Sequence, residues 1–482
     1  MNVTIVAVVA VYMLFMLGIG FYASKKITNT TDFMVAGRGM GPVLMAGTLA
    51  ATEIGGGSSL GVVEQASNLG TKQWGLSASW YIITMGIALV ILSFIAPKLR
   101  STEVKTVPEY FRRRYGKAAG LFTAITMILP LVGLTASQFM ASSTILSVMI
   151  GIDFKVAVIV VTIIVTTYAV LGGMWSVALT DFIQVGLIVV TMAIAIPFSM
   201  KYAGGYDAVV SSVPPETFDF FTGIGGPKAI FALIIMYVST FTVGQEAVCR
   251  YYSARDGKAA KQGSLLAALI NGVYAFIPTT LGIITLSMVL NGVVEESVIL
   301  EQGARYTLPV LATITMPPIM TGLLFAGIIS ATMSSADSDM LGAGSIFSND
   351  IYLEYINKDA DDKKIMRVTQ LSMIVIGILG MFVAMNATSI INLLMFSFTL
   401  RAAGAFFPYV MGHYWKKASP AGALAALIVG GIVSVAYERI DGLKFFGWEQ
   451  QTVIPGLVSA LIVFIIFSIL MPPKNATTEL TD

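Results

Sequence analysis

The sequence has only one cysteine, Cys249, one histidine, His413, and few charged residues. A single cysteine excludes an internal disulfide and a thiolate cluster, and a single histidine excludes a histidine metal site. No GxxxxGK[ST] phosphate loop occurs, so ATP is not expected to drive the activity. The net charge is +2 and there is no basic block. We therefore expect no nucleic-acid partner.

Hydrophobic residues make up 56% of the 482 residues and charged residues 12%, with a mean hydropathy of +0.82. Soluble domains carry about 25% charged residues, so this composition predicts an all-α polytopic membrane protein. The first apolar stretch lacks a basic leader and a cleavage site, so we expect a retained helix. At about 20 residues per span we expect about thirteen transmembrane helices. Their approximate ranges are 3–24, 42–68, 73–97, 119–149, 155–171, 176–200, 227–249, 264–291, 318–347, 366–386, 388–414, 419–437 and 453–471.

Lysine and arginine are distributed unequally between the two sides that these spans define. One set of loops holds 21 of them and the other set holds seven, and Arg401 alone falls inside a span. Cytoplasmic loops carry the excess of basic residues. We therefore predict a protein of the cytoplasmic membrane with its amino terminus outside and its carboxyl terminus in the cytoplasm.

A glycine triplet interrupts the second span, within Ala51-Thr-Glu-Ile-Gly-Gly-Gly-Ser-Ser59. Each glycine weakens a helix by roughly 1 kcal/mol relative to alanine. Irregular backbone at membrane depth is tolerated only inside protein or beside a wet cavity, where freed carbonyls can bind a cation. Glu53 beside the break is a functional candidate because acids are costly in the membrane. The alternative is a glycine-packed helix crossing with Glu53 in a structural ion pair.

A second polar stretch, residues 331–339, lies in the ninth span. Ala331, Ser334 and Ser335 share one helix face and offer neutral oxygen ligands, which suit a small hard cation. Serines in membrane helices can instead bond the preceding turn or pack against a neighbour. Asp337, Ser338 and Asp339 follow, and they indicate either a wet site or the cytoplasmic mouth.

Two further acids have more than one interpretation. Asp181 caps its helix together with Thr180, or it is a second cation ligand or a proton acceptor. Glu246 pairs with Arg250 at i+4, or it faces the cavity together with Gln245.

Arg401 requires a carboxylate, from Glu53 or from a substrate. Gln138 is a cavity-lining candidate or a helix-packing amide. In an inner loop, Thr106 and Pro108 predict the start of a short helix.

Several stretches, in order along the chain, resemble the sodium:solute symporter family. They are Gly37-Arg-Gly-Met-Gly41, Val107-Pro-Glu-Tyr-Phe-Arg-Arg-Arg-Tyr-Gly116, Gly172-Gly-Met-Trp-Ser-Val-Ala-Leu-Thr-Asp-Phe-Ile-Gln184, Gln245-Glu-Ala-Val-Cys-Arg-Tyr-Tyr-Ser-Ala-Arg255, Met333-Ser-Ser335 and Asp350-Ile-Tyr352. The resemblance implies the leucine-transporter fold, with two five-helix inverted repeats at 42–200 and 227–415 and a broken helix in each. An extra helix and inner loop would occupy 1–41, an outer loop 201–226, and two peripheral helices with a tail 416–482.

The resemblance also implies sodium-driven uptake by alternating access, with Na+ as the coupling ion. The main sodium ligands would be the carbonyls of Ala51, Ile54 and Ala331 and the hydroxyls of Ser334 and Ser335. Asp181 and Ser338 match part of a second sodium position that some members have, and Asp337 stands where those members carry a hydroxyl.

Glu53, Gly55 and Ser58 match substrate-facing positions in the family. In the family that this sequence resembles, sugar-transporting members carry an amide side chain at the position of Glu53, and proline symporters carry an aspartate there. An acid disfavours a sugar and permits an amine-bearing solute, or an acid that Arg401 neutralises.

The sequence thus predicts a sodium-coupled symporter that imports a small polar organic solute, and not an enzyme. Gln138, Gln245, Glu246 and Arg401 would complete the solute site. Proton coupling through Glu53, Asp181 or Asp337 is one alternative, and a solute receptor without net transport is another. A channel is disfavoured because no filter repeat or charge ring occurs.

Overall fold

The computed structural model describes residues 2–25, 27–69, 74–440 and 453–473, and this part of the chain contains twenty α-helices and no strand. The predicted start of the third span at residue 73 and the tail from residue 474 lie outside the described residues. The helices are α1 (Val3–Ser24), α2 (Thr30–Val35), α3 (Pro42–Glu53), α4 (Val62–Ser67), α5 (Trp80–Ser101), α6 (Val107–Tyr115), α7 (Lys117–Ile150), α8 (Phe154–Tyr202), α9 (Tyr206–Ser212), α10 (Gly226–Val243), α11 (Gln245–Ser253), α12 (Gly257–Tyr274), α13 (Phe276–Leu290), α14 (Glu296–Leu300), α15 (Thr307–Thr315), α16 (Pro318–Ile346), α17 (Asp362–Asn386), α18 (Ile390–Tyr414), α19 (Pro420–Arg439) and α20 (Val453–Leu470).

Eleven helices in the described part are long and apolar enough to cross a membrane. Of the other predicted spans, 155–171 appears as the shorter apolar helix Phe154–Val170, and 42–68 is divided between α3 and α4. The helical segment observed at the predicted span 264–291 is longer than that prediction, because α12 and α13 form one stretch from Gly257 to Leu290. The all-helical membrane fold is therefore confirmed.

The predicted spans 155–171 and 176–200 are joined within α8 through a sharp change at Gly173. This glycine has φ 55° and ψ −175°, a conformation that side-chain-bearing residues rarely adopt. A Cβ there would also lie 2.8 Å from Cδ2 of Phe33. Glycine is thus required at this turn for both backbone and packing reasons.

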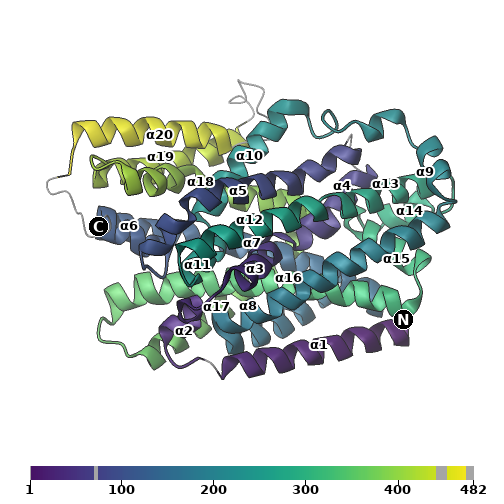
Figure 1. Ribbon diagram of the computed structural model, residues 1–482, viewed down its shortest axis with the longest axis horizontal. Helices are drawn as coiled ribbons and strands as arrows, with labels where there is room; N and C mark the ends of the chain where they lie inside the picture. The colour runs from purple at the N-terminus through teal and green to yellow at the C-terminus, as the bar shows by residue number, and fades with distance from the viewer. Residues whose placement is uncertain (1, 26, 70–73, 441–452, 474–482) are drawn as a thin grey trace.

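The long helices form a bundle in which α1 lies along one edge and α19 and α20 lie along the opposite edge (Figure 1). In an apolar 18-residue stretch of each helix, 83% of the residues are buried for α16 but only 22% for α1. α16 packs against both α7 and α8, and α1 contacts α8 and α16. α16 is therefore the central helix, and most of the surface of α1 faces outward.

The short helix predicted after Thr106 is α6. The Thr106 hydroxyl accepts a hydrogen bond from the Glu109 backbone N–H at 3.2 Å, and Pro108 lies in the first turn. This capping interaction confirms the local prediction.

Candidate functional site

The second span is broken where the glycine triplet predicted it. α3 ends at Glu53, Ile54 leaves the helical conformation with φ −87° and ψ 70°, and a π-helical turn covers Gly57–Gly61 before α4 begins. The hydroxyl of Ser58 closes the break, because it donates to the Glu53 carbonyl at 2.7 Å and accepts from the Gly55 N–H at 3.0 Å. Ser58, predicted to face substrate, is thus engaged by the backbone of its own break.

Gly55 lies where two neighbouring helices come close to the break. A Cβ at this position would lie 2.9 Å from Oε1 of Gln138 and 3.0 Å from Oγ of Ser335. Gln138 Oε1 also accepts a hydrogen bond from the Gly56 N–H at 2.9 Å. Gln138 therefore supports the broken backbone, and glycine at position 55 lets α7 and α16 approach it.

Oxygen atoms from α3 and α16 meet beside the break. The hydroxyl of Ser335 lies 3.1 Å from the carbonyl oxygen of Ala331 and 3.3 Å from that of Ala51. Three of the five predicted sodium ligands therefore converge, and Ile54, a fourth, is buried at the end of α3. Neutral, hard oxygen donors of this kind fit an alkali cation.

Ser334, the fifth predicted sodium ligand, makes a contact that the sequence did not indicate. Its hydroxyl donates to the carboxylate of Asp181 on α8. Asp181 lies in the interior of α8, so the interpretation of Thr180 and Asp181 as a helix cap is wrong. Asp181 instead positions a serine of α16.

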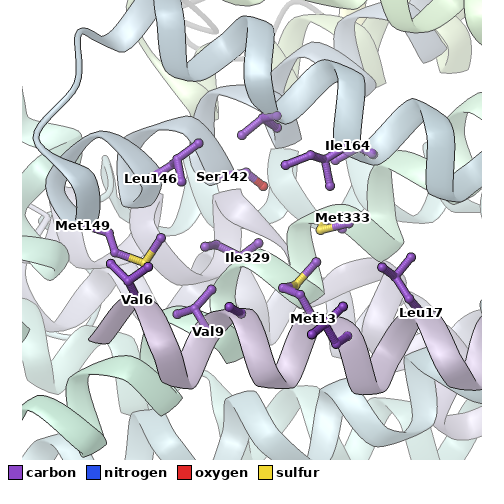
Figure 2. Close-up of a pocket in the computed structure, with 14 residues that line it drawn as sticks. Val6, Val9, Met13, Leu17, Ser142, Leu146, Met149, Ile164, Ile329 and Met333 are labelled. Atoms are coloured by element: carbon purple, nitrogen blue, oxygen red, sulfur yellow. The ribbon is translucent and has the colours of Figure 1, made fainter. Parts of the chain in front are cut away.

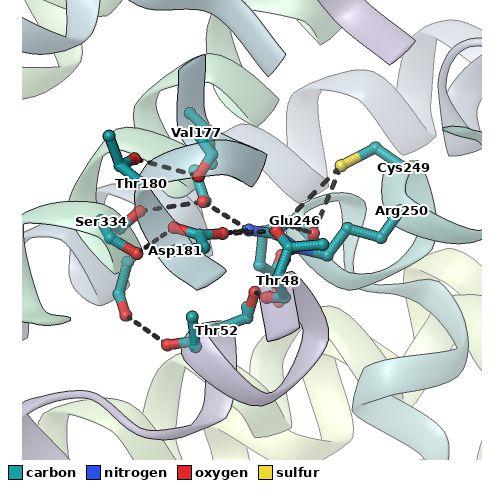
Figure 3. Close-up of polar contacts among 12 residues, drawn as sticks. Thr48, Thr52, Val177, Thr180, Asp181, Glu246, Cys249, Arg250 and Ser334 are labelled. Atoms are coloured by element: carbon teal, nitrogen blue, oxygen red, sulfur yellow. Dashed lines mark hydrogen bonds and ion pairs between the residues drawn. The ribbon is translucent and has the colours of Figure 1, made fainter. Parts of the chain in front are cut away.

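Asp181 belongs to a buried network that joins α3, α8, α11 and α16 (Figure 3). Nη2 of Arg250 donates to Asp181 Oδ2 at 3.0 Å and to Ser338 Oγ at 2.8 Å. Nε of Arg250 donates to Thr48 Oγ1 at 2.9 Å, and Thr48 in turn donates to Asp181. The guanidinium of Arg250 thus bridges Asp181 and Ser338, the two residues predicted for a second sodium.

The partner of Arg401 is Glu246, with Nη1 and Oε1 2.6 Å apart. The predicted ion pair between Glu246 and Arg250 is wrong, because the contact of Arg250 with Glu246 is a hydrogen bond to the backbone carbonyl and not to the carboxylate. Arg401 has a carboxylate partner, but Glu246 is neither Glu53 nor a substrate, the two partners predicted, and no Arg401–Glu53 ion pair forms in the described residues. Nε of Arg401 is held by the Thr240 hydroxyl at 2.5 Å.

Several polar atoms around this second ion pair are buried without a hydrogen bond in the described part of the protein. They are Glu53 Oε1, Glu246 Oε2 and Arg401 Nη2. Glu53 lies in the electrostatic field of Glu246, Arg401 and Arg250. The buried Asp339 of α16 also interacts electrostatically with Glu246 and Arg401. Buried polar groups normally have partners, so this cluster has unused binding capacity.

Aromatic side chains line the same region, and no sequence pattern distinguished them from core residues. The Tyr81 and Tyr237 ring centroids are 5.7 Å apart, and Tyr237 lies 5.8 Å from Phe398. The guanidinium of Arg401 lies over the Phe398 ring at 5.0 Å. Glu53 acts electrostatically on both tyrosines. These rings form an apolar wall next to the unpaired polar atoms.

Gln245 is placed differently from its prediction. Its Oε1 accepts from the Val107 N–H at 2.9 Å and its Nε2 donates to the Lys105 carbonyl at 3.1 Å. Both ends of the amide are therefore used to attach α11 to the segment that leads into α6.

Comparison with known proteins finds similarity to sodium:solute symporters along nearly the whole chain. Residues 33–430 match the model of the sodium:solute symporter family. The chain is 26% identical to the osmoregulated proline transporter OpuE of Bacillus subtilis, over 100% of this chain and 98% of that protein. It is 28% identical to the high-affinity proline transporter PutP of the same organism, over 96% and 98% of the two chains. It is also 28% identical to the sodium/pantothenate symporter of Haemophilus influenzae, over 100% and 99%.

Among solved structures, a substrate-bound, outward-open Na+-coupled sialic acid symporter has a TM-score of 0.81 at 21% identity, with 98% of each chain covered. The closed form of MHP1, a nucleobase-cation-symport-1 family transporter, has a TM-score of 0.59 at 12% identity, with 93% of this chain and 97% of that chain covered. The chain therefore has the leucine-transporter fold.

Proposed function

Because the chain belongs to the sodium:solute symporter family, we propose that the solute it carries is a small zwitterion of the amino-acid class. The chain is a multi-pass membrane protein that couples sodium to the uptake of a small polar organic solute by alternating access. It is a transporter and not an enzyme, and sodium coupling takes the place of the proton-coupled and receptor alternatives. The proposal concerns the solute and the residues that bind it.

The observation that carries the solute proposal is the set of buried atoms without a hydrogen bond on Glu53, Glu246 and Arg401. Glu53 Oε1 is available to a cationic nitrogen, and Arg401 Nη2 is available to a carboxylate. Asp339 adds a third acid, and of the two arginines whose charge reaches it, Arg250 is already paired with Asp181. An excess of acidic side chains favours a solute that brings a positive charge. The neighbouring rings of Tyr81 and Tyr237 would pack against its apolar part.

The relatives limit the choice of solute. Proline and pantothenate both carry a carboxylate, which suits Arg401. Only proline also carries a cationic nitrogen for Glu53. This comparison favours an amino acid over a pantothenate-like acid.

We place the sodium ion between α3 and α16, with the carbonyls of Ala51, Ile54 and Ala331 and the hydroxyls of Ser334 and Ser335 as ligands. Sodium would replace the weak hydrogen bonds that Ser335 now makes with two of these carbonyls. Ile54 directly follows Glu53, so the ion and the solute act on the same break. This proximity is the proposed basis of coupling.

We further propose that one sodium ion moves per cycle. Arg250 joins Asp181 to Ser338, so its fixed positive charge fills the space between the two residues of the second sodium position. A second cation there would have to displace a buried guanidinium against charge repulsion.

The two five-helix halves, 42–200 and 227–415, are proposed to be inverted repeats. The breaks support this division, because α3 is interrupted after Glu53 and α10 is separated from α11 at Gly244, which has ψ 117°. The basic-residue distribution supports an outside amino terminus and a cytoplasmic carboxyl terminus. The first residues of α1 and the last residues of α20 lie at opposite ends of the bundle (Figure 1).

The test is uptake of labelled proline into proteoliposomes that contain the full chain and carry an inward sodium gradient. N-acetylproline lacks the cationic nitrogen and pyrrolidine lacks the carboxylate. We expect proline and related amino acids to compete for uptake and the two truncated compounds to fail. Sodium-driven uptake of pantothenate with no uptake of amino acids would contradict the proposed solute class.

Glu53→Gln keeps the size of the side chain and removes the charge that would bind the cationic nitrogen. We expect the KM for the solute to rise by about tenfold to a hundredfold, with the half-saturating sodium concentration nearly unchanged. Glu64→Gln is the matched control, because Glu64 is a buried acid on the other half of the same broken span. Equal effects of the two substitutions would remove Glu53 from the solute site.

A further inference from the structure

A cavity of about 450 Å³ lies between α1 and the helices α7, α8 and α16 (Figure 2). Of the fourteen residues that line it, all but Ser142 are apolar. The hydroxyl of Ser142 already bonds that of Thr332. The cavity therefore offers no free polar group to water or to a polar solute, and it is separate from the proposed solute site.

The cavity extends from the interior of the bundle to its outer surface. Val9 and Met333, on its walls, are 5% and 4% exposed, whereas Leu14 at its rim is 67% exposed. Among the eleven long apolar helices of the described residues, α1 is the least buried, so this rim is part of the lipid-facing surface. The cavity is thus continuous with the interface between protein and bilayer.

We propose that an acyl chain of a membrane phospholipid occupies this cavity. Water requires two to four polar partners, which these walls do not supply. An empty cavity would forfeit the dispersion contacts of its lining. The adjacent bilayer supplies hydrocarbon at high concentration, and hydrocarbon matches the chemistry of every free wall atom.

The dimensions also favour a single hydrocarbon chain over a second copy of the protein. The lining residues of α1 run from Val6 to Leu17, roughly 16 Å along the helix axis. Dividing the volume by this length gives a mean cross-section of roughly 28 Å². A helix with side chains is about 10–12 Å wide and does not fit such a channel.

Charge at one end of α1 agrees with a phospholipid. Lys25 is exposed about two turns beyond Leu17, directly after α1 ends, and its Nζ lies 5.1 Å from the centre of the Phe21 ring. A phosphate at the bilayer surface would lie within the field of this lysine while its acyl chain runs along α1. The bound chain would then contact Met333, which directly precedes Ser334 of the central helix.

Photolabelling tests the proposal directly. The full chain is reconstituted in phosphatidylethanolamine and phosphatidylglycerol vesicles that contain a trace of a phospholipid with a diazirine near the end of one acyl chain. After irradiation, labelled residues are mapped by peptide mass spectrometry. We expect label on the buried Val9 and Met333 as well as on the exposed Leu14. Label confined to exposed residues such as Leu14 and Val11 would overturn the proposal, as would crosslinks between two copies of the chain at this site.

Val9→Phe places a ring in the cavity. Because overpacked apolar sites resist a further occupant, we expect label on Met333 to fall by about tenfold while label on Leu14 persists. Val11→Phe is the control, because Val11 lies on the same helix, is 68% exposed and does not line the cavity. If Val9→Phe lowers all labelling through misfolding, the pattern on the wild-type chain still decides. Undiminished label on Met333 in a folded Val9→Phe variant would contradict occupancy of the cavity.

Discussion

Two buried arginine–carboxylate pairs lie near the centre of this protein, and they differ in how completely they are bonded. In the Arg250–Asp181 pair, Nε, Nη1 and Nη2 of the arginine all have hydrogen-bond acceptors. In the Arg401–Glu246 pair, Nη2 of the arginine and Oε2 of the glutamate have none in the described residues. The first pair is complete and the second is not.

This difference indicates that the two pairs have different roles, one in positioning helices and the other in binding a ligand. A buried polar group without a partner costs free energy, whereas a fully bonded network rigidifies the elements that it joins. The Arg250–Asp181 network holds Ser334 and Ser338 of α16 against α3, α8 and α11, which sets the geometry of the proposed sodium site. The Arg401–Glu246 pair retains capacity for a ligand, as a solute site requires.

Arg250→Ala is expected to have the largest effect, because it leaves Asp181 as an uncompensated buried charge. Breaking such a pair costs about 3–5 kcal/mol, which thermal unfolding of the purified protein in detergent would detect. Arg401→Ala is the matched variant at the incomplete pair, and we expect it to abolish solute binding with a smaller loss of stability. Equal losses of stability would remove the distinction between the two pairs.

The second prediction concerns the serines that the complete network positions. Ser334→Ala combined with Ser335→Ala is expected to abolish sodium-stimulated uptake, because both hydroxyl ligands are lost. Ser335→Ala alone should raise the half-saturating sodium concentration by about tenfold to a hundredfold. Ser330→Ala is the control, because Ser330 lies on the same helix and bonds Tyr12 at 3.2 Å. Sodium dependence like that of the wild type in the double variant would reject the proposed site.

The smallest effect is expected from Thr240→Val, which removes the hydrogen bond to Nε of Arg401 and nearly preserves side-chain volume. One hydrogen bond is worth about 1 kcal/mol, so we expect the KM for the solute to rise roughly fivefold. The half-saturating sodium concentration should stay the same. A change in sodium dependence without a change in KM would show that Arg401 acts on the ion site instead.

Local patterns predicted much of the fold but little of the pairing within the site. The break after Glu53 follows from three consecutive glycines, and the α6 cap follows from Thr106 and Pro108. The pairing of Arg250 was predicted wrongly because the i, i+4 spacing favours Glu246. In the structure, Arg250 bonds a carboxylate 69 positions away and Glu246 bonds one of the few other buried cations, Arg401.

Composition, hydrophobic runs and the glycine triplet determined by themselves that this chain is a helical membrane protein with a discontinuous span. These features act over a few helical turns, so they can be read without knowing which helices are neighbours. The partner of each buried charge, the atoms left unbonded beside Glu53 and the apolar cavity behind α1 were decided only by tertiary packing. Each of them depends on side chains from helices far apart in the chain. Local sequence patterns do not determine how close such helices lie to one another.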